Sequence, residues 1–132
     1  MAFIKADLKD VKEASAVPEG EYSLRILKVE EGESKKGNPM LTLLIKIEDA
    51  QVKNPAPMRH WIVLPDRDTP EDQVQMRMLE LKRLLATFGI RYDGEGFDTD
   101  DLVGATGKGF VAQEEGDDGS VYNRLRLPRL KE

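Results

Sequence analysis

One segment of this 132-residue chain has a complete set of helix signals, and it lies between two groups of strand-like segments. The run Thr69-Pro70-Glu71-Asp72 predicts a helix start, with Thr69 as the N-cap, proline in the first turn and two acidic residues beside it. Gly89 predicts the end of the helix. Between these signals, apolar residues recur every three or four positions and indicate one buried face: Val74, Met78, Leu81, Leu85 and Phe88. We therefore predict a helix from Thr69 to Phe88 that covers an apolar surface.

Three strand-like segments precede this helix. Apolar and polar residues alternate from Tyr22 to Ile26, which is typical of a half-buried strand. The alternation changes phase near Leu27 and so predicts a β-bulge or a strong bend. Residues 40–47 are nearly all apolar, and residues 58–64 are more apolar at their even positions. The inward-facing residues predicted for these two segments are Leu41, Leu43, Ile45, Ile47, Met58, His60, Ile62 and Leu64.

Two further strand-like segments follow the helix. Residues 104–113 begin with glycines, which permit tight curvature, and residues 121–127 alternate before Pro128 ends the run. The acidic, glycine-containing turn at 115–119 joins them. Three strands, a helix and two strands are the element order of the OB-fold, a five-stranded Greek-key barrel that binds oligonucleotides and oligosaccharides. We therefore predict a mainly β protein with one helix between strands 3 and 4, placed over the open end of the barrel.

The length of the chain is that of a single domain. The breaker Pro18-Glu19-Gly20 separates a weakly patterned start from the first strand, so we expect residues 18–132 to form the OB-fold domain. Residues 1–17 are expected to form an N-terminal arm or a short docked helix. The helix alternative rests on four apolar residues with helical spacing: Phe3, Ile4, Leu8 and Val11.

Composition excludes several classes of protein. The chain has no cysteine, which excludes disulfides, zinc ribbons and thiol nucleophiles and is typical of a reducing cytosol. No apolar run approaches the roughly 18 residues that span a bilayer, so we expect a cytoplasmic protein without a membrane partner. The net charge is −5, but residues 66–120 hold fourteen acidic against six basic residues. Residues 20–65 hold six acidic and seven basic residues, so the strand faces can still bind phosphates.

Catalytic signatures are weak. The glycine-rich run at 104–109 has the wrong spacing for a phosphate-binding loop, and it lacks Ser or Thr after the lysine. His60 is the only histidine, so a histidine-based triad or a multi-histidine metal site cannot form. Two aspartate clusters, at 66–68 and 98–101, lie at turns where aspartate commonly caps the backbone. We therefore predict a protein that is not an enzyme, with no catalytic residue, metal or cofactor.

The alternation of the strands predicts a binding face. If the even positions of residues 58–64 point inward, Arg59 and Trp61 point outward, and Lys46 lies outward on the neighbouring strand. An exposed tryptophan beside cations suits single-stranded nucleic acid, because the ring stacks on a base and the cations attract phosphates. The alternative is that Trp61 belongs to the core and Arg59 is a solvated strand residue. The alternation favours neither.

The last strand and the first hairpin add further candidates. Tyr122, Arg124 and Arg126 share one face of the last strand, with three polar groups and no aliphatic residue. Lys35, Lys36 and Asn38 lie in the loop between strands 1 and 2, a position that OB-folds use for ligand binding. Lysines at a hairpin tip also serve solubility alone. With Lys46, Arg59 and Trp61, these residues complete the predicted nucleic-acid face.

Several short motifs resemble those of a bacteriophage family of small OB-fold proteins that bind single-stranded DNA, many of them described only as a domain of unknown function. The motifs occur in this order: Val17-Pro18-Glu19-Gly20-Glu21-Tyr22, Lys35 to Leu41, Leu81 to Gly89, Leu102-Val103-Gly104 and Tyr122-Asn123. The resemblance covers about residues 17–127. It implies sequence-independent binding of single-stranded DNA in phage replication or recombination, in the host cytoplasm. It places Lys35, Lys36 and Asn38 beside the DNA groove.

One departure from single-strand binders is the chain end. The segment 127–132 is short and basic, whereas many such proteins end in an acidic tail that recruits replication enzymes. The expected ligand is single-stranded DNA, with RNA as an alternative ligand and with replication or recombination proteins as candidate partners. The rival hypothesis is a protein–protein adaptor or inhibitor that uses its acidic surface. A small metal-dependent nuclease that uses the aspartate clusters is a third. The oligomeric state is left open.

Overall fold

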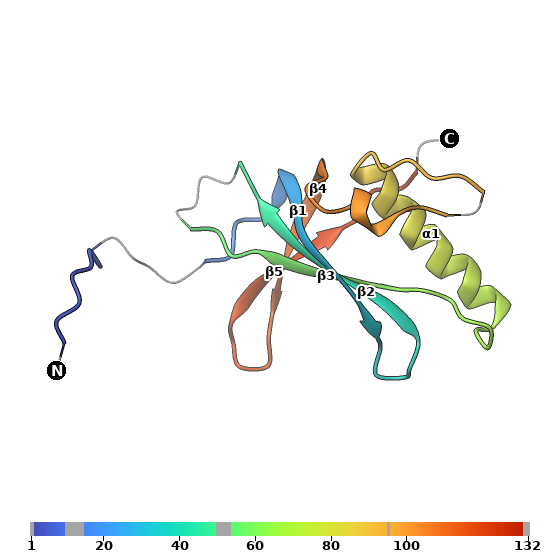
Figure 1. The fold of residues 1–132 in the computed structure, drawn as a ribbon, viewed down its shortest axis with the longest axis horizontal. Helices are drawn as coiled ribbons and strands as arrows, with labels where there is room; N and C mark the ends of the chain where they lie inside the picture. Colours follow the sequence, from blue (N-terminus) through green and yellow to red (C-terminus); the bar gives the residue numbers. More distant parts are fainter. Residues whose placement is uncertain (1, 10–14, 50–53, 95, 131–132) are drawn as a thin grey trace.

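Five antiparallel strands curl into a half-barrel with one helix between the third and fourth strands (Figure 1). The structure is a computed structural model that describes residues 2–9, 15–49, 54–94 and 96–130. The strands, helix and short 3₁₀ turn are β1 (Gly20–Glu33), β2 (Pro39–Ile47), β3 (Met58–Val63), α1 (Glu71–Thr87), η1 (Thr99–Asp101), β4 (Thr106–Glu115) and β5 (Val121–Arg126). Their order in the sheet is β3-β2-β1-β4-β5. The predicted OB-like, mainly β fold is confirmed.

The core consists of the inward faces of these strands. Every inward position predicted between Leu41 and Ile47 is buried, as are Met58 and Ile62 on β3. The predicted change of phase near Leu27 is a shift in the pairing of β1 with β2, between Ile26 and Lys28. This bulge lets the long β1 pair with β2 along most of its length while its first half pairs with β4.

The helix start differs from the prediction. α1 begins at Glu71, and the N-cap position is Pro70, which makes no side-chain cap hydrogen bond. The Thr69 hydroxyl turns back instead, donating to the Asp66 carboxylate at 2.9 Å and accepting from the Asp66 backbone N–H at 2.9 Å. Thr69 therefore closes the preceding turn, since its hydroxyl is already committed there, and the prediction of a Thr69 N-cap is wrong.

Only the second half of α1 is buried. Leu81, Leu84 and Leu85 are buried, and Phe88 follows them into the core. Met78 is 39% exposed, and Val74 is only partly buried, because the first half of the helix extends beyond the strands (Figure 1). The predicted apolar stripe is therefore correct for Leu81, Leu85 and Phe88 and wrong for Met78. Leu84 belongs to the buried face and was not predicted.

The end of α1 packs directly on β4. A β-carbon at Gly107 would lie 2.1 Å from the Thr87 carbonyl oxygen, so only glycine permits this approach of helix to strand. The predicted strand from residue 104 begins at Thr106, after Gly104 at a φ of +85°. The glycines of this run therefore serve packing and a turn.

The segment before β1 is held by a side chain of β5. Val17 is buried, its N–H donates to Asn123 Oδ1 at 2.8 Å, and Asn123 Nδ2 donates to the Val17 carbonyl at 3.0 Å. Among residues 2–9 there is no helix, and Phe3, Ile4 and Leu8 are exposed. Val11, the fourth residue of the predicted docked helix, lies outside the described residues.

Candidate nucleic-acid interface

Trp61 lies on the outer face of β3 and is 40% exposed, so it is not a core residue. It stands opposite Thr42 of β2, and Arg59 stands opposite Leu44. Met58 and Ile62, on the other face of the same strand, lie in the core, because side chains alternate across a strand. Of the two interpretations that the alternation left open, the structure supports the exposed one.

The edge strands β3 and β5 meet where the sheet curls on itself, and their outer side chains form a cluster that we call the seam: Arg59, Trp61, Tyr122 and Arg124. The Arg124 guanidinium carbon lies 4.8 Å from the centre of the Trp61 ring and 5.1 Å from that of Tyr122. Glu114 of β4 also bonds Arg124, at 3.2 Å from Nε. One cation thus contacts two aromatic rings, at distances where cation–π attraction operates.

A groove of about 310 Å³ opens at the seam and is lined by Pro57, Asn123 and the four seam residues. A smaller hollow of about 110 Å³ lies next to it on the outer face of β1, β2 and β3, and Arg59 lines both. In the second hollow, Lys28 Nζ pairs with the Glu30 carboxylate at 2.7 Å. The hydrogen bond and charge of Lys28 are the main causes that lower the pKa of the Glu30 carboxyl, and the positive charge of Arg59 adds a smaller effect. Arg59 therefore connects two parts of one outer surface.

The remaining predicted residues are dispersed. Lys46 is exposed on β2 opposite Arg25, and it lines neither hollow. Lys35 and Lys36 are exposed at the tip of the β1–β2 hairpin, where Asn38 closes the turn through its backbone N–H to Ser34 Oγ at 3.1 Å. This hairpin and the β4–β5 hairpin extend in the same direction from the sheet (Figure 1). The structure thus brings Arg59, Trp61, Tyr122 and Arg124 together, and it leaves Lys35, Lys36, Asn38 and Lys46 outside the seam.

Two outer-face residues were missed by sequence reasoning. Phe110 is 42% exposed on β4 and stands opposite Arg126 of β5. Its inward neighbours Gly109 and Val111 are buried, so the alternation of β4 contained the signal. Lys28 was missed because the bulge after Ile26 reverses the faces of β1. Phe110 and Arg126 place a second ring and a second cation opposite each other in the pairing of β4 with β5.

His60 lies on the inner side of β3, behind the seam. Its Nε2 is buried and accepts or donates no hydrogen bond within the described part of the chain. Burial, and then the positive charge of Arg124, lower the pKa of His60 to about 4. The neutral imidazole is therefore the folded-state form at neutral pH.

We expect this histidine to make stability depend on pH. His60 takes up a proton near pH 6.5 in the unfolded chain and only near pH 4 in the folded chain. The free energy of unfolding is therefore unaffected by this group above pH 6.5 and falls as the pH drops from 6.5 to 4. The loss at pH 4 is roughly 3 kcal/mol, at 1.36 kcal/mol per pKa unit. Urea titrations at several pH values should show this loss in the wild type and not in His60→Leu. Equal pH profiles for the two proteins would contradict the assignment.

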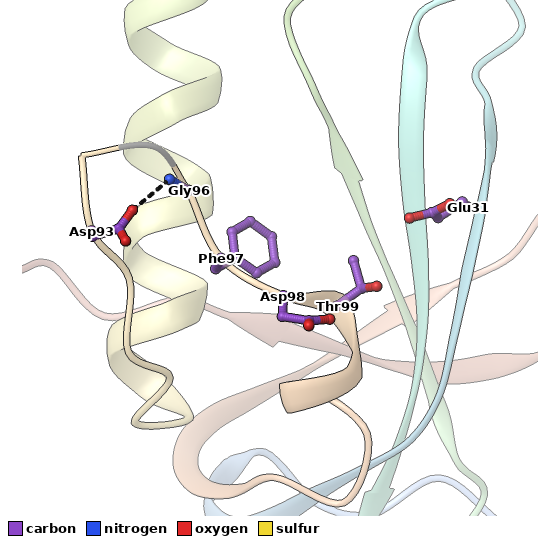
Figure 2. Close-up of a pocket in the computed structure, with 6 residues that line it drawn as sticks. All are labelled: Glu31, Asp93, Gly96, Phe97, Asp98 and Thr99. Carbon is purple, nitrogen blue, oxygen red and sulfur yellow. Dashed lines mark hydrogen bonds between the residues drawn. The ribbon is translucent and has the colours of Figure 1, made fainter.

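Three acidic residues, Glu31, Asp93 and Asp98, line another hollow, of about 530 Å³ (Figure 2). Asp93 there accepts a hydrogen bond from the Gly96 N–H at 3.1 Å, and Asp98 accepts one from Asp100 N–H at 2.9 Å. Asp66 likewise accepts from Asp68 N–H at 2.9 Å. Within the described ranges, no three His, Asp or Glu side chains converge as metal ligands. In each predicted cluster one aspartate, Asp66 or Asp98, thus caps a turn with its side chain.

None of the described helices combines the length and apolar character needed to cross a membrane.

Comparison with known proteins places the chain in a family. A comparison with curated proteins found no match. A family model described as "Protein of unknown function (DUF669)" matches residues 4–130. This match spans nearly the whole chain, the N-terminal arm included, and the protein therefore belongs to the DUF669 family.

Proposed function

We propose that this protein binds single-stranded DNA without sequence preference, as a non-enzymatic component of phage DNA replication or recombination. The observation that carries the proposal is the seam, where Arg124 contacts the rings of Trp61 and Tyr122. Rings that stack on bases and cations that attract phosphates are the two parts of a single-strand binding surface. The phage setting is supported by the resemblance of the sequence motifs to a phage family, and single-strand binding is a common use of OB-like barrels.

The seam has the geometry that such binding requires. Trp61 is 40% exposed although Arg124 lies over its ring, so part of the indole remains accessible to a base. The ion pair with Glu114 and the two ring contacts fix the guanidinium in advance, which lowers the entropy cost of ordering it on a phosphate. No base-specific donor set is needed, because every base has a face that stacks. RNA bases stack equally well, so RNA is included among the test ligands.

Trp61→Ala is the direct test. We expect it to lose roughly 1–3 kcal/mol of affinity for oligo(dT), with little change in the dependence on salt. The wild-type fluorescence should be quenched by oligo(dT), and the signal is unambiguous because Trp61 is the only tryptophan. Trp61→Phe keeps a stacking ring and should retain most of the affinity.

A second set of variants separates stacking from charge. Arg59→Ala should weaken binding to all sequences alike and reduce the single-strand salt slope by about 0.7, because one phosphate is no longer neutralised. Arg67→Ala removes the same charge from the exposed loop before α1 and serves as the matched control, with no expected change. If the wild type neither binds oligo(dT) nor shows quenching, the proposal fails. The acidic cavity of Figure 2 would then be the surface to test for the adaptor hypothesis.

A further inference from the structure

A second groove, away from the seam, is lined by four cations. It has a volume of about 820 Å³ and lies between the second half of α1, the start of β4 and the chain after β5. Lys82 and Arg83 come from α1, Lys108 from β4 and Arg129 from the end of the chain, and the described lining residues include no carboxylate. Tyr92, which is 49% exposed, adds a ring. In a protein of net charge −5, four cations with no lining carboxylate mark an anion-binding surface.

Arg83 is the most informative member of this group, which we call the basic groove. Its Nε is buried and has no hydrogen-bond partner among the described residues. Burying one guanidinium N–H without an acceptor is costly, and an anion bound at the other nitrogens would offset part of that cost. Lys82, one position earlier on α1, is exposed and adds a second donor at the same groove.

The basic groove is connected to the seam along β5. From Tyr122 and Arg124 the outer face of β5 continues to Arg126, which stands opposite Phe110, and the chain then reaches Arg129 in the groove. Lys108 lies two positions from Phe110 on the same side of β4, because side chains alternate. At about 3.3 Å per residue, the four steps from Tyr122 to Arg126 span roughly 13 Å of β5. Three further residues lead from Arg126 to Arg129 in the groove. Cations and rings thus succeed one another from the seam to the basic groove.

We infer that the basic groove holds the phosphate backbone of the same single-stranded DNA whose bases stack at the seam. The DNA then follows β5 around the edge of the barrel to α1. This inference rests on the proposed function and extends it. The continuity of the row along β5 favours a nucleic-acid strand over an acidic peptide, since a peptide would need no stacking ring between the two sites. A short oligonucleotide then occupies the seam alone, and a long one occupies both.

The test compares two oligo(dT) lengths, about 6 and about 20 nucleotides, one near the lower end of the usual span of one such fold and one above it. Lys82→Ala/Lys108→Ala should bind the long oligonucleotide about tenfold more weakly than the wild type and reduce its salt slope by about 1.4. Binding of the short oligonucleotide, and the quenching of Trp61 at saturation, should be unchanged. Lys5→Ala/Lys9→Ala removes two exposed lysines of the arm and is the matched control, with no expected effect on either length.

Each outcome separates this inference from the proposed function. If the long oligonucleotide binds the groove variant as tightly as the wild type, the inference about the groove is overturned and the proposed binding at the seam is unaffected. Equally weakened binding of both oligonucleotides overturns the inference as well, because the substitutions would then act on the seam itself. Binding of oligo-glutamate that depends on Lys82 and Lys108, without an effect on DNA, would assign the groove to a peptide. If the wild type binds neither length, both proposals fall.

Discussion

Leu84→Ala is expected to lower the free energy of unfolding by about 2–5 kcal/mol, the range for a large-to-small change in a packed core. Leu84 is fully buried where the second half of α1 joins the barrel core. Truncating this side chain loses transfer free energy and leaves a cavity that the rigid end of the helix cannot fill, because Gly107 already holds that end against β4. Urea denaturation, with an unchanged slope and a lower midpoint, measures the loss.

Leu79→Ala provides the matched control for this experiment. The residue type and the helix are the same, but Leu79, in the middle of α1, is 40% exposed. The expected loss is below about 0.5 kcal/mol, as for most surface substitutions. A loss at Leu79 equal to that at Leu84 would mean that the Leu79 side chain is packed as tightly as that of Leu84, which would contradict its exposure to solvent.

Asn123→Ala is expected to cost about 2–4 kcal/mol, although the residue is polar. Asn123 is buried, and its amide makes three hydrogen bonds, to the N–H and carbonyl of Val17 and to the Ala112 carbonyl at 3.2 Å. The Val17 carbonyl keeps a second donor, Gln113 Nε2 at 2.8 Å, but the buried Val17 N–H loses the partner that this side chain provides. Stranding a buried donor costs about 1–3 kcal/mol, and the lost volume adds to it.

Two variants separate these contributions. Asn123→Leu keeps the branched shape of the side chain, leaves no cavity and removes the amide, so a similar loss would show that the effect does not come from lost volume. Gln113→Ala removes one exposed donor to Val17 and should cost less than about 1 kcal/mol. If Asn123→Leu is as stable as the wild type, the amide does not hold the segment before β1. The urea midpoint is measured for Asn123→Ala, Asn123→Leu and Gln113→Ala.

The strands were predictable because their information is local. In β2 the alternation from Leu41 to Ile47 assigned the inward face, and the change of phase near Leu27 marked the bulge of β1. The outward position of Arg59 followed from the same alternation in β3, since a strand with one face in the core has one set of residues to expose. The helix itself was predictable from its start signals and from Gly89.

The sequence failed where an outcome depends on a competing or distant partner. Thr69 had the residue type of an N-cap, but the nearby Asp66 carboxylate competed for its hydroxyl. Met78 fits the apolar period as well as Leu81 does, and only the position of α1 relative to the strands leaves one exposed and the other buried. The periodicity of a helix indicates which face is buried, and it does not indicate how much of the length is covered.

By itself, the sequence of this protein determined the order of its elements, the inward face of β2 and the existence of its helix, because each of these depends on neighbours within a few residues. The tertiary structure alone decided that Arg124 lies over Trp61, since the sheet must curl before β3 meets β5. It also decided that Lys82, Lys108 and Arg129 line one groove. Such contacts join residues far apart in the chain, and no local pattern specifies them because they arise only when the barrel forms.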